Sequence, residues 1–217
     1  MYRGLLGLPA TQTQEASLAS VFAPAPIVGN WALLNAGPFG AVCEYGASLS
    51  TDTMYFHAFP LTRRITISSL GARIVNASAG GNFALAIYAH GRDGPIGVPL
   101  ASTGNMSTAS ATAVTSSITG GNVTLAPNIY WSAVWQDNAV AGFTNISMDF
   151  PNLFNVMIGN AAAGTVISDA SASGVSLAVI KTFNSSAWPN PQVERLSGNY
   201  YESNNLNLNA AIMGKFA

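Results

Sequence analysis

The residues that could activate a serine nucleophile or replace it, His and Cys, are few in this sequence, and they are scattered. The only histidines are His57 and His90, the only cysteine is Cys43, and no Gly-x-Ser-x-Gly segment occurs. A Ser or Cys nucleophile needs a basic group within hydrogen-bond reach, and the Gly-x-Ser-x-Gly turn is one motif that exposes such a Ser. Nothing in the spacing brings these types together, so we expect Cys43 to be a buried, inert thiol.

The acidic residues also occur singly. They are Glu15, Glu44, Asp52, Asp93, Asp137, Asp149, Asp169, Glu194 and Glu202. A glycosidase needs two carboxyl groups that converge across a sugar bond, about 5 to 10 Å apart, and the spacing predicts no such pair. Asp137 with Asn138, or Asp149, has the oxygen ligands that calcium prefers, although solvated loop acids are the simpler interpretation. A single cysteine excludes an intrachain disulfide and a cysteine-based zinc site. We therefore predict no enzyme activity, no metal and no cofactor.

Aromatic side chains in one long segment are the best candidates for a binding site. Residues 181–204 contain Trp188, Tyr200 and Tyr201 together with several asparagines and two prolines. Long loops often carry function, and a sugar site combines an aromatic face with nearby polar groups. We predict that these three aromatic residues contact a glycan or a neighbouring subunit. The alternative is a loop that covers an edge of the fold.

Charge is scarce along the whole chain. The 217 residues include 8 Lys and Arg and 9 Asp and Glu, which makes 8% charged residues and a net charge of −1, against roughly 25% charged residues in a typical domain. No basic run exceeds Arg63-Arg64, which excludes most nucleic-acid binders because they need clustered Lys and Arg. Apolar residues make up 49%, which argues against disorder. No apolar run approaches the length of about 18 residues that spans a bilayer.

Small neutral residues take the place of charge, including 21 glycines. A surface of Ala, Ser, Thr and Asn suits close packing against copies of itself, because little charge repels the neighbours. The composition therefore predicts an obligate oligomer.

The elements that must position these residues are strands. From about residue 29 onward, apolar residues alternate with polar or small ones, which is typical of strands. The alternating runs lie at 65–67, 70–74, 83–87, 118–125, 130–135, 175–179 and 206–212. The phase shifts by one residue between Ile67 and Leu70, beside Gly71, which predicts a β-bulge. Turn segments rich in Gly and Asn separate the runs, so the pattern predicts an antiparallel β-sandwich or barrel.

Two of these runs predict strand faces that pack closely. Alanines at 84, 86 and 89 alternate with larger apolar residues, and a solvent-facing strand would more often carry charge or Thr. Trp131 and Trp135 lie four residues apart and so share one face of their strand. Core packing is the simpler interpretation for both tryptophans, and sugar binding is the alternative.

The N-terminal segment differs from the rest, and we predict that residues 1–50 form an anchoring arm and residues 51–217 the sandwich. Thr11 to Gln14 could cap a short helix, which Pro24 and Pro26 would end. The arm's candidate contact residues are Leu5, Leu6, Leu8, Leu18, Val21 and Phe22. A loosely ordered tail is the alternative. The apolar stretch near the start is shorter than a signal peptide needs.

Four segments of the predicted sandwich resemble a known family. They read ITISSLGARI (65–74), GGNFALAIY (80–88), GPIGVPL (94–100) and TLAPNIYW (124–131). In this order and spacing they resemble the jelly-roll-like β-sandwich domain of tail-fibre and other virion proteins of tailed bacteriophages. The likeness covers about residues 50–217 and is strongest from 63 to 135. Asn128 stands where the family usually has Gly, a change that a turn with positive φ tolerates.

This resemblance implies a non-enzymatic virion protein that is made in the host cytoplasm and assembles as a homotrimer or in a symmetric ring. The leading expectation is a short tail fibre or tail-appendage subunit, with the arm as anchor and a jelly-roll-like sandwich that contacts the host envelope or another fibre. A capsid-decoration protein that clamps capsid subunits is the second expectation, and a surface-glycan depolymerase is the third. The implied partners are further copies, other virion proteins and, as an option, a host surface glycan, without nucleic acid or membrane insertion.

Overall fold

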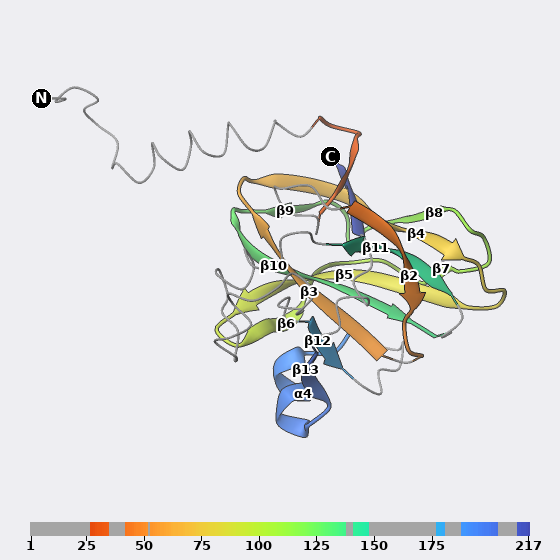
Figure 1. Ribbon diagram of the computed structural model, residues 1–217. Coiled ribbons are helices and arrows are strands. Elements are labelled where there is room, and N and C mark those ends of the chain that lie inside the picture. Colours follow the sequence, from red (N-terminus) through yellow and green to blue (C-terminus); the bar gives the residue numbers. More distant parts are fainter. Residues whose placement is uncertain are drawn as a thin grey trace, which may run out of the picture.

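The computed structural model of the chain is a β-sandwich with one short helix in its described part (Figure 1). It describes residues 27–34, 42–51, 53–137, 141–147, 177–180, 188–203 and 212–217. The strands are β1 (Trp31–Leu33), β2 (Val42–Ser48), β3 (Thr53–Leu61), β4 (Ile65–Asn76), β5 (Asn82–Gly91), β6 (Gly94–Ser102), β7 (Met106–Ser107), β8 (Ala113–Ser117), β9 (Val123–Leu125), β10 (Asn128–Gln136), β11 (Gly142–Ser147), β12 (Leu177–Ile180), β13 (Tyr200–Ser203) and β14 (Ile212–Phe216), and the helix is α4 (Pro191–Ser197). Within these ranges no helix has the length and hydropathy that a membrane crossing requires.

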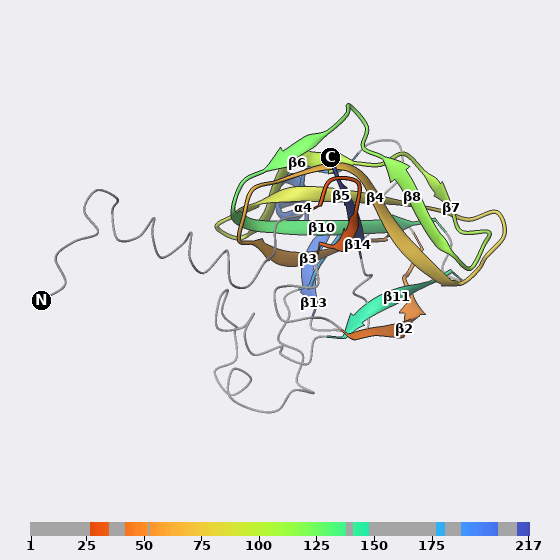
Figure 2. The same ribbon diagram turned by 90° about the horizontal axis from the view of Figure 1, so that it is seen from above.

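The strands form two sheets, and every pair of neighbouring strands is antiparallel. The first sheet has the order β1-β14-β4-β11-β2, and β8 and β9 also pair with β4. The second sheet has the order β13-β12-β3-β10-β5-β6, and β7 also pairs with β5. In the view from above, β4 runs across β5 and β10 of the other sheet (Figure 2). The predicted all-β, antiparallel sandwich is therefore confirmed.

The main core lies between the two sheets, because each inner strand directs every second side chain inward. Its large members include Tyr55 and Phe59 from β3, Leu85 from β5 and Phe143 from β11. The rings of Phe83 and Phe143 meet edge to face with centroids 5.1 Å apart. Burial of each large apolar side chain stabilises the fold by roughly 1.5–3 kcal/mol, so this core is the main source of stability in the sandwich.

Strand β4 contains the predicted bulge, although at a different residue. Phe216 of β14 pairs with Ile67 and Lys215 pairs with Ser69, so Ser68 is the extra residue. The predicted position beside Gly71 is therefore wrong.

Gly71 is required for close packing of two strands, because a Cβ there would lie 2.7 Å from a methyl group of Thr115 and 2.9 Å from the carbonyl oxygen of Val114. Glycine allows β8 to approach β4 this closely.

Part of the segment that was predicted to be an arm belongs to the sandwich. Strand β1 pairs with β14, and β2 pairs with β11. Leu34 and Leu49 are buried in the main core. Strands of the sandwich thus begin at Trp31, before the predicted boundary at residue 50. All six candidate anchoring residues lie between residues 1 and 26, outside the described ranges, so the anchoring function stays a prediction.

Candidate functional site

A second apolar cluster lies on the outer face of the second sheet, opposite the main core. Its buried members are Met54, Phe56, Ala58, Ala84, Ala86, Tyr88, Trp131, Ala133 and Trp135. They come from β3, β5 and β10 and alternate with residues of the main core, as strand geometry requires. The predictions that the face of Ala84 and Ala86 packs closely and that both tryptophans are packing residues are therefore confirmed. Ala89, the third alanine of that prediction, is only half-buried and does not belong to this cluster, so its inclusion was wrong. The central strands of this sheet are buried on both faces.

A segment near the C-terminus packs against this outer cluster. Trp188 is half-buried and contacts the cluster, and the phenol of Tyr88 donates a hydrogen bond of 3.0 Å to the carbonyl oxygen of Pro189. The ring of Tyr88 also meets Phe56 edge to face at 5.2 Å. Burial raises the pKa of Tyr88, so its phenol keeps the proton that it donates.

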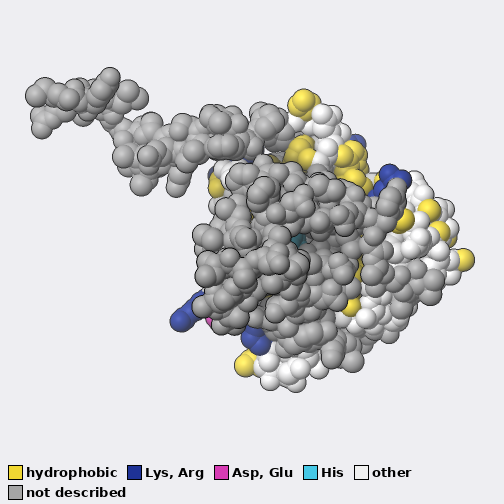
Figure 3. Space-filling view, in the orientation of Figure 1, with side chains coloured by type: hydrophobic (Ala, Val, Ile, Leu, Met, Phe, Trp, Pro, Cys, Tyr) yellow, Lys and Arg dark blue, Asp and Glu magenta, His cyan; other side chains and the backbone are white. Residues whose placement is uncertain are grey.

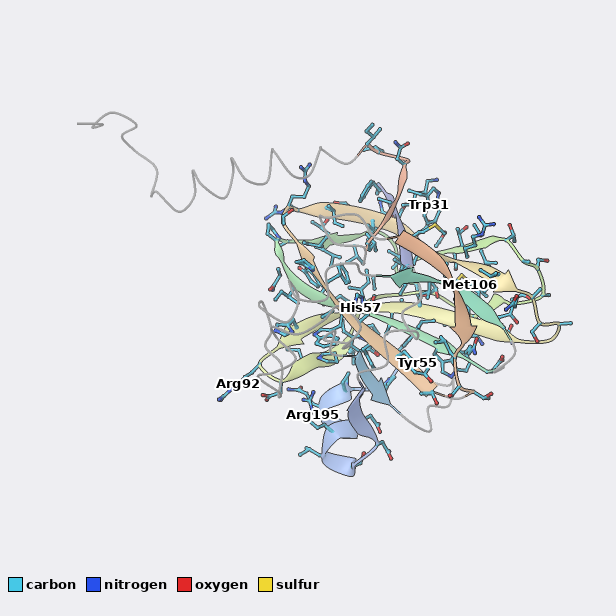
Figure 4. The ribbon with its side chains drawn as sticks, in the orientation of Figure 1. Trp31, Tyr55, His57, Arg92, Met106 and Arg195 are labelled. Carbon is cyan, nitrogen blue, oxygen red and sulfur yellow. The ribbon has the colours of Figure 1, made fainter. Side chains whose placement is uncertain are left out.

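Helix α4 continues this segment, and both of its ends are capped. The side chain of Asn190 accepts a hydrogen bond of 3.1 Å from the amide of Gln192, and Gly198 ends the helix with a φ of 79°. The guanidinium group of Arg195 donates to the carbonyl oxygen of Asp93 in the turn between β5 and β6. Figure 4 shows Arg195 on α4 at the bottom of the molecule, with Arg92 of that turn to its left. Residues 188–198 are thus attached to the sheet at several points.

His90 and Trp131 form a polar contact at the border of the cluster. The indole N–H of Trp131 donates to Nδ1 of His90 at 2.9 Å, and the two rings stack with centroids 6.1 Å apart. Nδ1 accepts only when it carries no proton, and burial lowers the pKa of His90. His90 therefore serves here as a neutral acceptor that fixes the orientation of Trp131.

The other histidine is a core residue. His57 lies in β3 between the sheets with only 3% of its surface exposed, and burial lowers its pKa to about 4. The hydroxyl group of Ser132 donates to the main-chain oxygen of His57 at 3.1 Å, so this contact does not activate the hydroxyl through the imidazole ring. The predicted absence of nucleophilic catalysis is consistent with this placement, and it stays a prediction.

Asp137 has a structural role. Its carboxylate accepts hydrogen bonds from the amide of Asn82 at 2.6 Å and from the side chain of Asn82 at 3.0 Å. It thereby links the end of β10 to the start of β5. The described ranges contain no group of three or more His, Cys, Asp or Glu residues that could hold a metal ion. Asn138 and Asp149, the other calcium candidates, lie outside these ranges, as does the side chain of Cys43.

The structure places the three predicted contact residues differently. Trp188 packs on the outer cluster, while Tyr200 and Tyr201 begin β13 and pair with Ile180 and Val179 of β12. The side chains of both tyrosines lie outside the described part. The predicted contact of these three residues with a glycan or a subunit stays a prediction.

Sequence reasoning missed α4 and the apolar residues that it exposes. The signals were present, since Asn190 is a good N-cap, Pro191 suits the first turn and Gly198 is a typical stop. Val193 and Leu196 face solvent, and Leu196 is 90% exposed.

Comparisons with protein-family models and with curated proteins give no match for this chain, so its function is inferred from its own residues, fold and contacts.

Proposed function

We propose that this chain is a non-enzymatic structural subunit of a bacteriophage virion, and specifically a short tail fibre or tail-appendage subunit. The resemblance of residues 63–135 to virion sandwich domains supports the class of protein. The observation that carries the role is the exposure of large apolar side chains on a chain with 8% charged residues. Apolar patches on soluble proteins mark contact sites, and a rigid sandwich holds them in place.

The exposed large apolar residues of the described ranges come from three places, of which β6 contributes Val98 and Leu100. The other two places lie at different ends of the molecule. One contains Ile27, Val28 and Trp31 at β1, and the other contains Val193 and Leu196 on α4. Figure 4 shows Trp31 in the upper part of the molecule and Arg195 of α4 at the bottom. In a tail appendage, one end would attach to the particle and the other would contact the host envelope or a second fibre.

The described chemistry supports a binding role. His57 is a core residue, His90 orients Trp131, and Asp137 links two strands. Several weak contacts on one particle multiply the overall strength of adsorption, so no single site needs to be tight. Homo-oligomerisation, expected as a trimer, would provide such multiple contacts.

A capsid-decoration protein is the second candidate, and the same two ends favour it. A clamp between neighbouring capsid subunits needs a contact surface for each neighbour, and β1 and α4 offer one surface each. Copy number separates the two candidates, because an appendage needs a few dozen copies per particle at most and a decoration protein needs hundreds. A surface-glycan depolymerase is the third candidate.

Antibody labelling of particles of the encoding phage, viewed by electron microscopy, tests the proposal. Label at the tail supports an appendage, label over the shell supports the capsid clamp, and absence from the particle overturns both. Release of reducing ends from host polysaccharide by the purified protein would favour the depolymerase.

Residues 188–203 can be tested separately by competition. Purified protein should inhibit phage adsorption to host cells, and Trp188→Ala should weaken that inhibition, because Trp188 holds this segment on the outer cluster. Val98→Ala is the matched control, since Val98 is an exposed apolar residue of β6. Unchanged inhibition by Trp188→Ala would remove this segment from the contact surface.

A further inference from the structure

Among the strands that the structure describes, β1 is an edge of the first sheet. It stands at one end of the strand order and pairs with β14. The main chain bonds β14 at both ends of β1, since Phe216 donates to the carbonyl oxygen of Asn30 and Leu34 donates to that of Ile212, both at 2.9 Å. Hydrogen-bonding directions alternate along a strand. Trp31 and Leu33 therefore direct their N–H and C=O groups away from β14.

The surface at this edge is apolar and carries no charge of its own. Ile27, Val28 and Trp31 are 67%, 74% and 39% exposed, and they are three of the seven large hydrophobic residues exposed within the described ranges. Residues 27–34 contain no charged side chain. In Figure 3, hydrophobic side chains gather at the upper end of the molecule, where Figure 1 places β1. Exposed, uncharged strand edges are templates for pairing with another strand.

One edge strand of the second sheet, β6, is protected in ways that β1 lacks. Strand β6 contains Pro95 and Pro99, which have no N–H to donate. Its pairing with β5 is irregular between Ile87 and Ala89, and Gly97 has a φ of 71°. Bulges and prolines of this kind prevent a further strand from pairing. Neither a proline nor an irregular register occurs in β1.

We propose that two copies of this chain pair through β1, antiparallel, about a two-fold axis at Ala32. In this register Trp31 of one copy lies opposite Leu33 of the other, and the outward N–H and C=O groups of these residues form four main-chain hydrogen bonds. Ala32 meets its own counterpart on the axis, where its small side chain leaves room. The two first sheets become one continuous sheet.

A second copy fits this edge, because the donors and acceptors match under the two-fold axis and the apolar, uncharged surface of residues 27–34 meets an identical surface. Charge does not oppose the pairing. Lys215 is in register with Trp31, but it lies one strand further from the axis. The two Lys215 residues would be at least about 14 Å apart, which is three strand spacings and exceeds the Debye length of about 10 Å at 0.1 M salt.

The pairing rests on the proposed function and deepens it, because it makes a second copy of the subunit the partner of the β1 surface and leaves the α4 surface for other contacts. A trimer can form without β1. A two-fold contact predicts an even number of copies. If the contact also joins trimers, the assembly contains six copies.

Light scattering on the full chain during size-exclusion chromatography tests the pairing. We expect twice the 22.4 kDa mass of one chain, or a higher even multiple. Trp31→Lys places a charge in the interface, one residue from the axis, and Trp31→Pro removes an outward donor without removing a bond to β14. Both variants should halve the mass while circular dichroism stays unchanged, and Val98→Lys, a matched exposed residue of β6, should leave the mass unchanged.

A mass of one or three chains for the wild type would overturn the pairing, as would an even assembly that persists in both Trp31 variants. If residues 1–26 cover β1, or if β1 binds a different protein, the purified wild type has the mass of one chain, and the pairing is overturned. Hydrogen exchange gives a second readout, because the amides of Trp31 and Leu33 should exchange at least about tenfold more slowly in the associated protein. Particle labelling decides the proposed function independently of these results.

Discussion

The buried His57 makes the stability of the fold depend on pH. Its side chain lies between the sheets, on the same side of β3 as Tyr55 and Phe59, and burial lowers its pKa from 6.5 to about 4. In the unfolded chain the imidazole takes up a proton near pH 6.5, whereas the folded protein resists protonation down to about pH 4. The unfolded state therefore binds more protons between these two values, and the free energy of unfolding falls as pH decreases.

The two pKa values set the size of this effect. The free energy of unfolding should fall by about 2 kcal/mol between pH 7 and pH 5 and by about 3 kcal/mol at pH 4. Domains of this kind are stable by about 5–15 kcal/mol, so the loss is readily measured. Burial also lowers the pKa of His90, which adds a loss of the same sign. Ordinary carboxyl groups titrate near pH 4 and contribute little above pH 5.

Urea unfolding at several pH values between 5 and 7 measures this dependence. His57→Leu keeps an apolar side chain of similar size between the sheets and removes the titrating group, so its stability should change little over this range. His90→Gln should keep most of the wild-type dependence and serves as the control. If His57→Leu and the wild type lose stability equally between pH 7 and pH 5, burial of His57 does not cause the pH dependence and the reasoning is refuted.

Two further predictions concern backbone packing and a strand link. Gly71→Ala should destabilise the fold by about 1–3 kcal/mol, because its Cβ would lie 2.9 Å from the carbonyl oxygen of Val114. Thermal unfolding against Gly104→Ala, where a Cβ meets nothing within 4 Å, checks this, and equal melting temperatures would contradict it. Asp137→Ala should cost about 1–3 kcal/mol, because the amide of Asn82 loses its carboxylate partner. Asp137→Asn keeps one acceptor oxygen and should recover part of the loss in urea unfolding, and no difference between the two variants would argue against the link.

Local sequence patterns were sufficient for the strands and for their faces. Alternation with a period of two predicted that Ala84 and Ala86 would pack closely and that Trp131 and Trp135 would be packing residues, because successive side chains of a strand must point to opposite faces. The same periodicity revealed the phase shift in β4. It did not locate the bulge, because the extra residue, Ser68, is defined by the register with β14.

The candidate site depended on contacts between distant residues. Helix α4 had recognisable start and stop signals in the sequence, but the attachment of Arg195 to Asp93 joins residues 102 positions apart. The link between Asp137 and Asn82 spans 55 positions. Side chains of the same type can be solvated or buried, and their local sequence does not distinguish these cases.

The sequence by itself determined the class of the fold, since the spacing of apolar residues and the turn residues between them act over a few positions. The tertiary structure decided which residues share a surface. His57 became a core residue through the stacking of two sheets, and the segment around Trp31 became a sheet edge through pairing with β14, which lies about 180 positions later in the chain. Such pairings depend on the packing of the whole chain, which no local pattern records.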